Sequence, residues 1–235
     1  MTGPANAVFR GQITLDGPSG TGKSSVARAV AARLGAAYLD TGAMYRAATV
    51  AVLDAGVDPE DADAVARVVA RAVIEVGTTA GEEVVRVNGV DVAARIRSAE
   101  VTRAVSPVSA VPAVRRQLVD QQRALVGAAE AVVVEGRDIG TVVLPDATLK
   151  VYLTAAPEVR AQRRAGQLGL REAVDIAALA EDLRKRDEYD SSREDSPLRP
   201  AADAVIVDST NLDRAAVIKR VVELAGKAVR AEEWA

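Results

Sequence analysis

The segment that most constrains the fold of this 235-residue chain is a run of eight residues near its start, GPSGTGKS at positions 17–24. It matches the P-loop pattern G-x-x-x-x-G-K-[ST] without a mismatch. The apolar residues 12–16 (QITLD) before it predict a strand, and residues 23–34 after it predict a helix that ends at Gly35. In such a strand–loop–helix unit, backbone N–H groups and the positive end of the helix bind phosphate oxygens. The chain is therefore expected to bind ATP or GTP.

Strand and helix patterns alternate along most of the remaining chain. Short apolar runs predict further strands at residues 36–40, 131–134, 149–153 and 204–207. Helical patterns occupy residues 43–55, 59–76, 112–127, 157–165, 172–191 and 212–229. Pro59 fits the first turn of one of these helices, and Asn211 is a candidate cap for the last. The alternation predicts an α/β fold with a five-stranded parallel sheet flanked by helices.

One part of the chain departs from this alternation. Residues 82–87 and 90–92 flank Asn88-Gly89, a turn typical of an antiparallel hairpin. Pro107 and Pro112 are unfavourable inside a helix, which argues against one long helix in this part. We expect a single domain, residues 1–235, with a small antiparallel insertion at about residues 76–111.

Composition excludes several classes of function. The chain contains no Cys and no His, which excludes disulfides, cysteine nucleophiles, the usual zinc sites and a Ser-His-Asp triad. Lys and Arg total 30 against 33 Asp and Glu, a net charge of −3, so the overall charge does not attract nucleic acid or an anionic membrane. The sequence shows neither a signal-peptide pattern nor an apolar run approaching ~20 residues. We expect a cytoplasmic protein without nucleic-acid or membrane partners.

The P-loop supplies the expected ATP-binding residues, which are Gly17, Pro18, Ser19, Gly20, Thr21, Gly22, Lys23, Ser24 and Ser25. Lys23 is expected to reach the β- and γ-phosphates, and Ser24 to ligate Mg²⁺. Glu135, which follows the strand at 131–134, is a candidate for a water-mediated contact with that Mg²⁺. A P-loop by itself does not distinguish a kinase from a switch or a motor.

Two further segments carry charges that suit a second substrate. Arg46 lies early in the helix after Asp40, near its positive end, where a cation is unfavourable unless an anion binds beside it. Arg137 and Asp138 follow the strand at 131–134, on the sheet edge where open α/β sheets bind ligands. A carboxylate can accept the N4 amino group of cytosine while an arginine donates to its N3 and O2. The alternatives are a surface arginine and a salt-bridged loop.

A third charged group lies near the end of the helix at 172–191. Arg186, Asp190 and Arg193 are spaced i, i+4 and i+7, which predicts that they share one helix face. An arginine-bearing helix that closes over the phosphates would form a lid, at about residues 164–198. The alternative is a solvated amphipathic helix with surface ion pairs.

The absence of histidine is compatible with phosphoryl transfer to a nucleoside monophosphate. A hydroxyl acceptor usually needs a carboxylate base, whereas a phosphate with a second pKa near ~6 is already mostly a dianion at neutral pH. The protein then has to align two charged phosphates, which Arg, Lys and Mg²⁺ can do.

Five segments together resemble the bacterial cytidylate kinase family. They are DGPSGTGKSS at 16–25, LDTGAMYR at 39–46, EGRDIGTVVLPDA at 135–147, RDEYDSSR at 186–193 and PAADAVIVDST at 200–210. The phrases TGAMYR and GRDIGTVV are much more specific than the P-loop. The resemblance implies a P-loop kinase fold with a monophosphate-binding insertion and a short lid. It also implies transfer of the ATP γ-phosphoryl group to CMP or dCMP, with Mg²⁺ as cofactor, by a chain that we expect to be a monomer.

The resemblance also implies roles for matching residues. Those expected to bind CMP are Thr41, Tyr45, Arg46, Ser106, Arg115, Arg137, Asp138, Arg186 and Asp190. Those expected to act in catalysis are Lys23, Arg137, Arg186 and Arg193. Within this set, Arg46 and Arg115 would contact the CMP phosphate. Ser106 would contact cytosine, Arg137 and Asp138 would read cytosine and its surroundings, and Asp190 would contact the sugar hydroxyls.

The chain departs from the family pattern at four positions. Glu135 stands where other members have Asp, and Ser24 stands where many monophosphate kinases have Gly. Tyr189 and Ser191 stand where some members have arginines, which reduces the positive charge of the lid.

Two other functions fit the P-loop. One is a small-molecule kinase of the shikimate or gluconate type, which needs a carboxylate base such as Asp40 or Asp138. The other is a nucleotide-dependent switch or assembly ATPase, which would hydrolyse its nucleotide without an acceptor. A guanine-specific N-K-x-D motif is absent from the sequence, which weighs against a GTPase.

Overall fold

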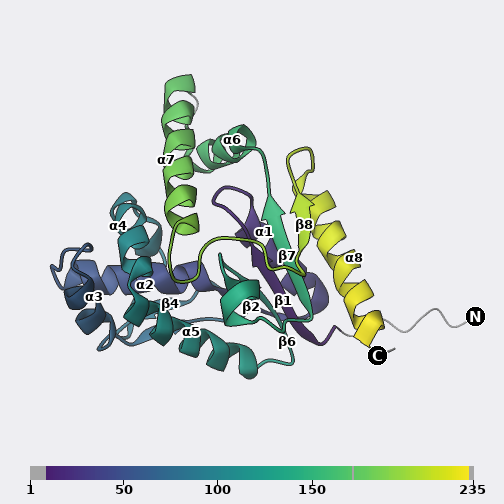
Figure 1. Ribbon diagram of the computed structural model, residues 1–235, viewed down its shortest axis with the longest axis horizontal. Coiled ribbons are helices and arrows are strands. Elements are labelled where there is room, and N and C mark those ends of the chain that lie inside the picture. Colours follow the sequence, from purple (N-terminus) through teal and green to yellow (C-terminus); the bar gives the residue numbers. More distant parts are fainter. Residues whose placement is uncertain (1–8, 171, 233–235) are drawn as a thin grey trace, which may run out of the picture.

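The computed structural model describes residues 9–170 and 172–232, and its central element is a parallel sheet with the strand order β2-β6-β1-β7-β8 (Figure 1). The strands are β1 (Gly11–Asp16), β2 (Ala37–Asp40), β6 (Ala131–Glu135), β7 (Leu149–Thr154) and β8 (Val205–Asp208). The helices are α1 (Lys23–Leu34), α2 (Thr41–Asp54), α3 (Ala62–Val69), α4 (Ala99–Ala110), α5 (Pro112–Gly127), α6 (Pro157–Leu168), α7 (Ala173–Ser191) and α8 (Arg214–Glu232). The predicted five-stranded parallel sheet flanked by helices is confirmed.

Successive residues of the strands face opposite helix layers. In β6, Val133 packs in the core that contains α1 and α8, whereas Val132 and Val134 pack in the core that contains α2, α4 and α5. Because both faces of β6 are covered, the strand is apolar along most of its length rather than alternating with polar residues. In Figure 1, α8 lies on one side of the molecule and helices α2 to α5 gather on the other.

A second, antiparallel sheet lies beside this second group of helices. Its strands are β3 (Ile74–Val76), β4 (Val85–Val87) and β5 (Val90–Asp91). β4 and β5 are joined by Asn88 and Gly89, whose φ values of 51° and 80° are those of a left-handed hairpin turn. The predicted hairpin is confirmed.

The predicted helix at 59–76 is wrong at both ends. Helix α3 begins at Ala62, because the carboxylate of Asp61 accepts a hydrogen bond from the N–H of Ala64 (3.0 Å) and caps the helix there. The chain leaves the helix after Val69 and becomes strand β3, where Ile74 pairs with Val87 and is buried. Pairing with β4 thus overrides the helical pattern of the sequence.

Two other local predictions need correction. Pro107 does not interrupt the chain, since α4 continues through it to Ala110. Val105 and Val108 on the same helix are buried in the core, and this burial offsets the proline penalty of ~3 kcal/mol. The cap of α8 is Asp213, whose carboxylate accepts from the N–H of Ala216 (2.7 Å), and not Asn211.

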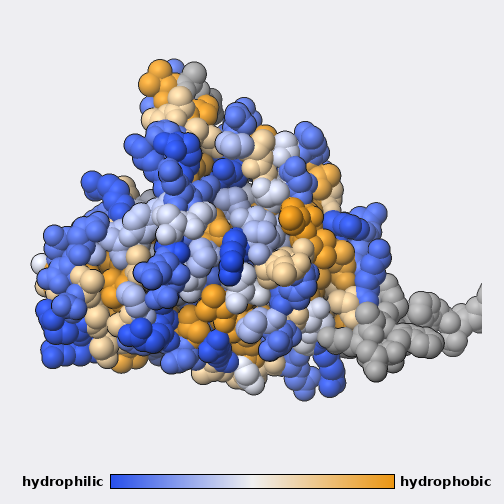
Figure 2. All heavy atoms as spheres, in the orientation of Figure 1, coloured by the Kyte–Doolittle hydropathy of each residue, from blue (hydrophilic) through white to orange (hydrophobic). Residues whose placement is uncertain are grey.

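Helices α6 and α7 stand out from the rest of the molecule. Figure 1 shows α7 rising away from the sheet with α6 beside it, and the two are joined at Gly169, which is left-handed with φ 71°. Figure 2 shows hydrophobic atoms at the outer end of α7 and hydrophilic atoms along its middle. Val174 in the first turn of α7 and Leu168 at the end of α6 are both exposed. Among the described residues, the structure contains no helix with the length and apolar character needed to cross a membrane.

Candidate active site

The candidate site lies where three parallel strands end side by side. Within the sheet, β6 lies between β1 and β2, and Glu135 is paired with Leu15 of β1 and with Asp40 of β2. The loops after these strands therefore meet at one sheet edge. They are the P-loop (Gly17–Gly22), the segment Gly136–Asp138 and the start of α2 at Thr41. The sequence motifs singled out above are thus brought together.

The P-loop depends on glycine for its backbone path. Gly17 has φ 141°, and a Cβ atom there would lie 2.0 Å from the carbonyl oxygen of Leu153. Lys23 at the start of α1 is buried, and its Nζ donates to the carbonyl of Pro18 (2.7 Å). Burial and the nearby charge of Arg137 hold the pKa of Lys23 well below its ordinary range. A phosphate group beside this ammonium would favour its charged form.

Glu135 forms a buried oxygen-rich pair with Ser24. The Ser24 hydroxyl donates to Glu135 Oε2 (2.9 Å), and the Tyr38 hydroxyl donates to Oε1. Burial, with a contribution from Asp40, raises the pKa of Glu135 to about 7. In the described residues no cluster of three or more potential acidic ligands occurs. One hydroxyl and one carboxylate fit Mg²⁺, which usually takes few protein ligands and completes its shell with phosphate and water.

Arg137 links the P-loop to helix α7. Its Nη1 donates to the Gly17 carbonyl (3.0 Å), its Nη2 donates to the Ser19 hydroxyl (2.6 Å), and its Nε donates to Asp190 Oδ2 (3.0 Å). Arg193 donates to the other oxygen of Asp190. Asp190 is buried, and its two arginine partners hold it in place. Arg137 therefore lies at the phosphate end of the P-loop.

Arg193 does not share a helix face with Arg186. Helix α7 ends at Ser191, so Arg193 lies in the following loop, and the predicted i, i+4, i+7 face is wrong for this residue. It still reaches Asp190, and its guanidinium also donates to the Ser109 hydroxyl of α4 (3.0 Å).

Several positively charged side chains of the site lie close to one another. Burial and the charges of Arg137 and Arg46 lower the pKa of Arg186 to about 9. Burial also lowers the pKa of Arg46 to about 10, while its Nη1 donates to the Ile96 carbonyl and the Thr102 hydroxyl (both 3.0 Å). Buried arginines normally pair with carboxylates. Arg46 and Arg186 instead lie near other cations, which suits them to bind multiply charged anions.

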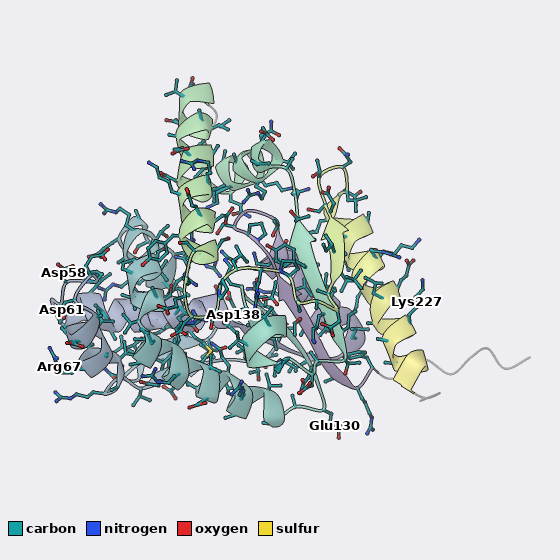
Figure 3. The ribbon with its side chains drawn as sticks, in the orientation of Figure 1. Asp58, Asp61, Arg67, Glu130, Asp138 and Lys227 are labelled. Carbon is teal, nitrogen blue, oxygen red and sulfur yellow. The ribbon has the colours of Figure 1, made fainter. Side chains whose placement is uncertain are left out.

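Arg115 and Asp138 form a buried ion pair beside this cluster. Arg115 Nη2 lies 2.5 Å from Asp138 Oδ2, and the two side chains are 5% and 4% exposed. Arg115 also donates to the Ser109 carbonyl (3.1 Å), and its guanidinium lies 5.2 Å from the centre of the Tyr45 ring. Figure 3 shows Asp138 near the middle of the molecule, below the inner end of α7.

The remaining predicted residues lie around these groups. The Thr41 hydroxyl donates to the Glu135 carbonyl (2.7 Å), which fixes the start of α2 against the end of β6. Ser106 is half-buried on α4, and its carbonyl accepts from the Ser109 hydroxyl (3.0 Å). Ser25 is more exposed and donates to the Gly22 carbonyl within its own turn (2.8 Å).

Sequence reasoning missed two acidic residues of the site. Asp16 is buried at the end of β1, where its oxygens accept from the N–H groups of Ile139 (2.9 Å) and Gly140 (2.8 Å) and so hold the loop that carries Asp138. Asp187 on α7 accepts from the N–H of Ser19 (3.1 Å). The available signals were the position of Asp16 immediately before the P-loop and that of Asp187 immediately after Arg186.

The comparison with known families decides which P-loop protein this is. The family model described as "Cytidylate kinase" matches residues 13–227, which is most of the chain. The chain belongs to the cytidylate kinase family. The matched span includes the P-loop, the Arg115–Asp138 pair and helix α7, so the whole candidate site lies inside it.

Individual members of the cytidylate kinase family are similar along most of their length. A cytidylate kinase of Nocardia farcinica is 55% identical over 208 residues, which cover 88% of this chain and 89% of that protein. A cytidylate kinase of Streptomyces avermitilis is 52% identical and covers 94% and 95%. A solved gluconokinase from Sinorhizobium meliloti has a TM-score of 0.53, with 16% identity, covering 96% of this chain and 97% of its own. The gluconokinase shares the fold alone, whereas family membership makes this chain an ATP-dependent nucleoside monophosphate kinase.

Proposed function

We propose that this member of the cytidylate kinase family transfers the γ-phosphoryl group of ATP to CMP and dCMP, giving ADP with CDP or dCDP in pyrimidine nucleotide metabolism. The observation that carries the proposal is a cluster of cations: Lys23 and Arg137 donate to the P-loop, and the charges of Arg137 and Arg46 act on Arg186. Two phosphorylated substrates that meet in line repel each other, and a cluster of cations between them offsets that repulsion.

The ATP side is formed by residues 17–25. Backbone N–H groups of the loop and the start of α1 bind the phosphates, and Lys23, the first residue of α1, would act on the β- and γ-phosphates. Ser24, with Glu135 behind it, would hold Mg²⁺. When bound, the ion neutralises charge on the transferring phosphates.

The acceptor side is formed by the start of α2 and by α4. Arg46 and Arg115 bind the phosphate of CMP, while Thr41, Tyr45 and Ser106 line the same space. The phosphate of CMP is mostly a dianion at neutral pH, so the reaction does not require a general base. This difference separates the proposal from a hydroxyl kinase, whose acceptor has a proton that must be removed.

Selectivity for cytosine rests on Asp138. One of its oxygens is paired with Arg115, and the other can accept the N4 amino group of cytosine. Uracil presents an oxygen at that position, and two acceptors facing each other are unfavourable. Asp190 holds Arg137 and Arg193, and in the proposal it would also contact the sugar hydroxyls.

The lid contributes to the phosphoryl-transfer step. Arg186 and Arg193 lie on α7 and in the loop after it, and Asp190 connects Arg193 to Arg137 and so to the P-loop. Arginines on a transferring phosphoryl group typically contribute ~10³–10⁵ in rate. We include in the proposal a monomer that works in the cytoplasm, where it meets ATP and CMP.

The proposal is tested by product formation. The protein is incubated with ATP, MgCl₂ and CMP, and the nucleotides are separated and quantified with time. We expect equal amounts of CDP and ADP, and loss of both when EDTA is in excess over Mg²⁺. ADP without CDP would indicate an ATPase, and unchanged ATP in the presence of Mg²⁺ and CMP would refute the proposal.

A further inference from the structure

Helix α7 places a carboxylate directly on the P-loop. Asp187 Oδ1 accepts a hydrogen bond from the backbone N–H of Ser19 (3.1 Å), and Oδ2 accepts from the Arg160 guanidinium of α6. The Asp187 side chain is only 16% exposed. A P-loop N–H group is a phosphate donor, and here it binds a protein carboxylate.

Arg160 makes this contact part of a packed unit. Its side chain is buried, and its Nη1 also donates to the carbonyl of Ser19 (3.1 Å). Its backbone lies so close to Gly20 that a Cβ atom there would be 2.9 Å from the Arg160 carbonyl oxygen. Helices α6 and α7 are therefore joined to the P-loop through one arginine and one carboxylate.

The carboxylate resembles a phosphate group in charge and in the donors it uses. It accepts from a P-loop N–H and from a guanidinium, and its negative charge acts on Lys23, where it favours the charged form. These are the interactions that a nucleotide phosphate would make at the same loop.

We propose that Asp187 is an internal anion that occupies the P-loop in the absence of nucleotide and must leave it when ATP binds. The inference rests on the proposed function in one respect, that the P-loop binds ATP. Release of Asp187 frees the Ser19 N–H for phosphate and removes one link between α7 and the loop, another being Arg137 with Asp190. ATP binding and the position of the lid are thereby coupled.

The coupling has a measurable consequence. A contact made only without nucleotide stabilises the nucleotide-free protein and weakens ATP binding by the same factor. A hydrogen bond to a charged group is typically strong enough for a factor of roughly ten or more. Asp187→Asn removes the charge, keeps the size, and should therefore tighten ATP binding by roughly tenfold.

The experiment measures ATP binding directly, by isothermal titration calorimetry without CMP. Asp182→Asn is the matched control, because Asp182 lies one turn away on α7 and is exposed. We expect a Kd for ATP about tenfold lower for Asp187→Asn and an unchanged Kd for Asp182→Asn. We also expect Asp187→Asn to lower the Tm of the free protein but to leave the Tm at saturating ATP unchanged.

An unchanged or higher Kd for Asp187→Asn would overturn the proposal, as would an equal loss of Tm with and without ATP, which is the result for a merely structural contact. If the wild-type protein does not bind ATP at all, the proposed function fails instead, so the two failures are distinguishable.

A second measurement does not depend on the folding of Asp187→Asn. The chain has no cysteine, so spin labels can be attached to an Asp182→Cys/Lys227→Cys variant, which spans α7 and α8 at exposed positions (Figure 3 labels Lys227). The proposal predicts that ATP alone shifts the distance distribution between the labels. A distribution that ATP leaves unchanged would contradict it.

Discussion

Removal of Arg115 should destabilise the protein strongly because it leaves Asp138 buried without a partner. The two side chains are 5% and 4% exposed, so water cannot solvate the carboxylate that remains. Breaking a buried pair on one side typically costs about 3–5 kcal/mol of unfolding free energy. We therefore expect Arg115→Met to lose about 4 kcal/mol, a large part of the ~5–15 kcal/mol that stabilises a typical domain.

The double variant tests whether the loss of stability in Arg115→Met comes from the unpaired charge of Asp138. In Arg115→Met/Asp138→Asn the uncompensated charge is gone, and the main remaining loss is the hydrogen bond to the Ser109 carbonyl, at about 1 kcal/mol. The double variant should therefore be more stable than the single one by about 2–3 kcal/mol. Arg184→Met is the control, because Arg184 pairs with Glu181 and Glu188 on the exposed face of α7, and it should leave the unfolding free energy nearly unchanged.

The assay is urea unfolding followed by circular dichroism at 25 °C, with unfolding free energies from linear extrapolation. Constant m-values across the four proteins are required for the comparison. A loss below about 1 kcal/mol for Arg115→Met, or a double variant no more stable than the single one, would refute the interpretation of the pair as a buried, mutually compensating charge pair.

Three further predictions concern other parts of the site. Arg186→Ala should lower kcat roughly 10³-fold and raise the KM for CMP far less, because in the proposed function Arg186 acts on the transferring phosphoryl group. Equal small effects in steady-state assays would contradict this role. Burial raises the pKa of Asp16 from 3.8 to about 6, so the folded chain binds this proton more tightly than the unfolded chain does. Wild-type stability should therefore fall relative to Asp16→Asn by about 3 kcal/mol as pH rises from below 4 to above 6, and parallel pH profiles in urea unfolding would argue against it. Gly136→Ala should lower the unfolding free energy by about 1–3 kcal/mol in the same assay. A Cβ atom at this position would lie 2.5 Å from Ile139 Cδ1 and 2.7 Å from Thr41 Oγ1. An unchanged unfolding free energy would show that these side chains move aside freely.

The sheet and the P-loop were predictable because local signals and tertiary structure agree there. The strand before Gly17, the glycines and the helix from Lys23 all indicate the same unit, and the remaining parallel strands are short, mostly apolar runs, of which the central β6 is buried on both faces. Helix α3 and strand β3 were not separated, because the change from helix to strand depends on pairing of Ile74 with Val87, a contact outside the local helical pattern. Pro107 was misjudged because its local penalty is offset by core packing that the sequence does not display.

The sequence predicts which residues belong to the site better than it predicts which of them contact one another. Motif spacing brought Arg137, Asp138 and Asp190 to attention, but most of their partners are distant in the chain: Arg115 is 23 positions from Asp138, Asp190 is 53 from Arg137, and Ser19 is 118 from Arg137. Two arginines share Asp190, and Asp138 is held by Arg115, which on sequence grounds alone is an ordinary residue. Asp187 lay next to a predicted residue, yet its contact with the P-loop depends on how α7 packs.

The most direct test of the proposed function compares acceptors side by side. ADP release from ATP and Mg²⁺ is measured with CMP, dCMP, UMP, AMP, GMP and no acceptor, for the wild-type protein. We predict turnover with CMP and dCMP that is far faster than with the other nucleotides or without an acceptor. Equal turnover with UMP would contradict the reading of cytosine by Asp138, and ADP release that is the same with and without any acceptor would contradict the assignment as a CMP kinase.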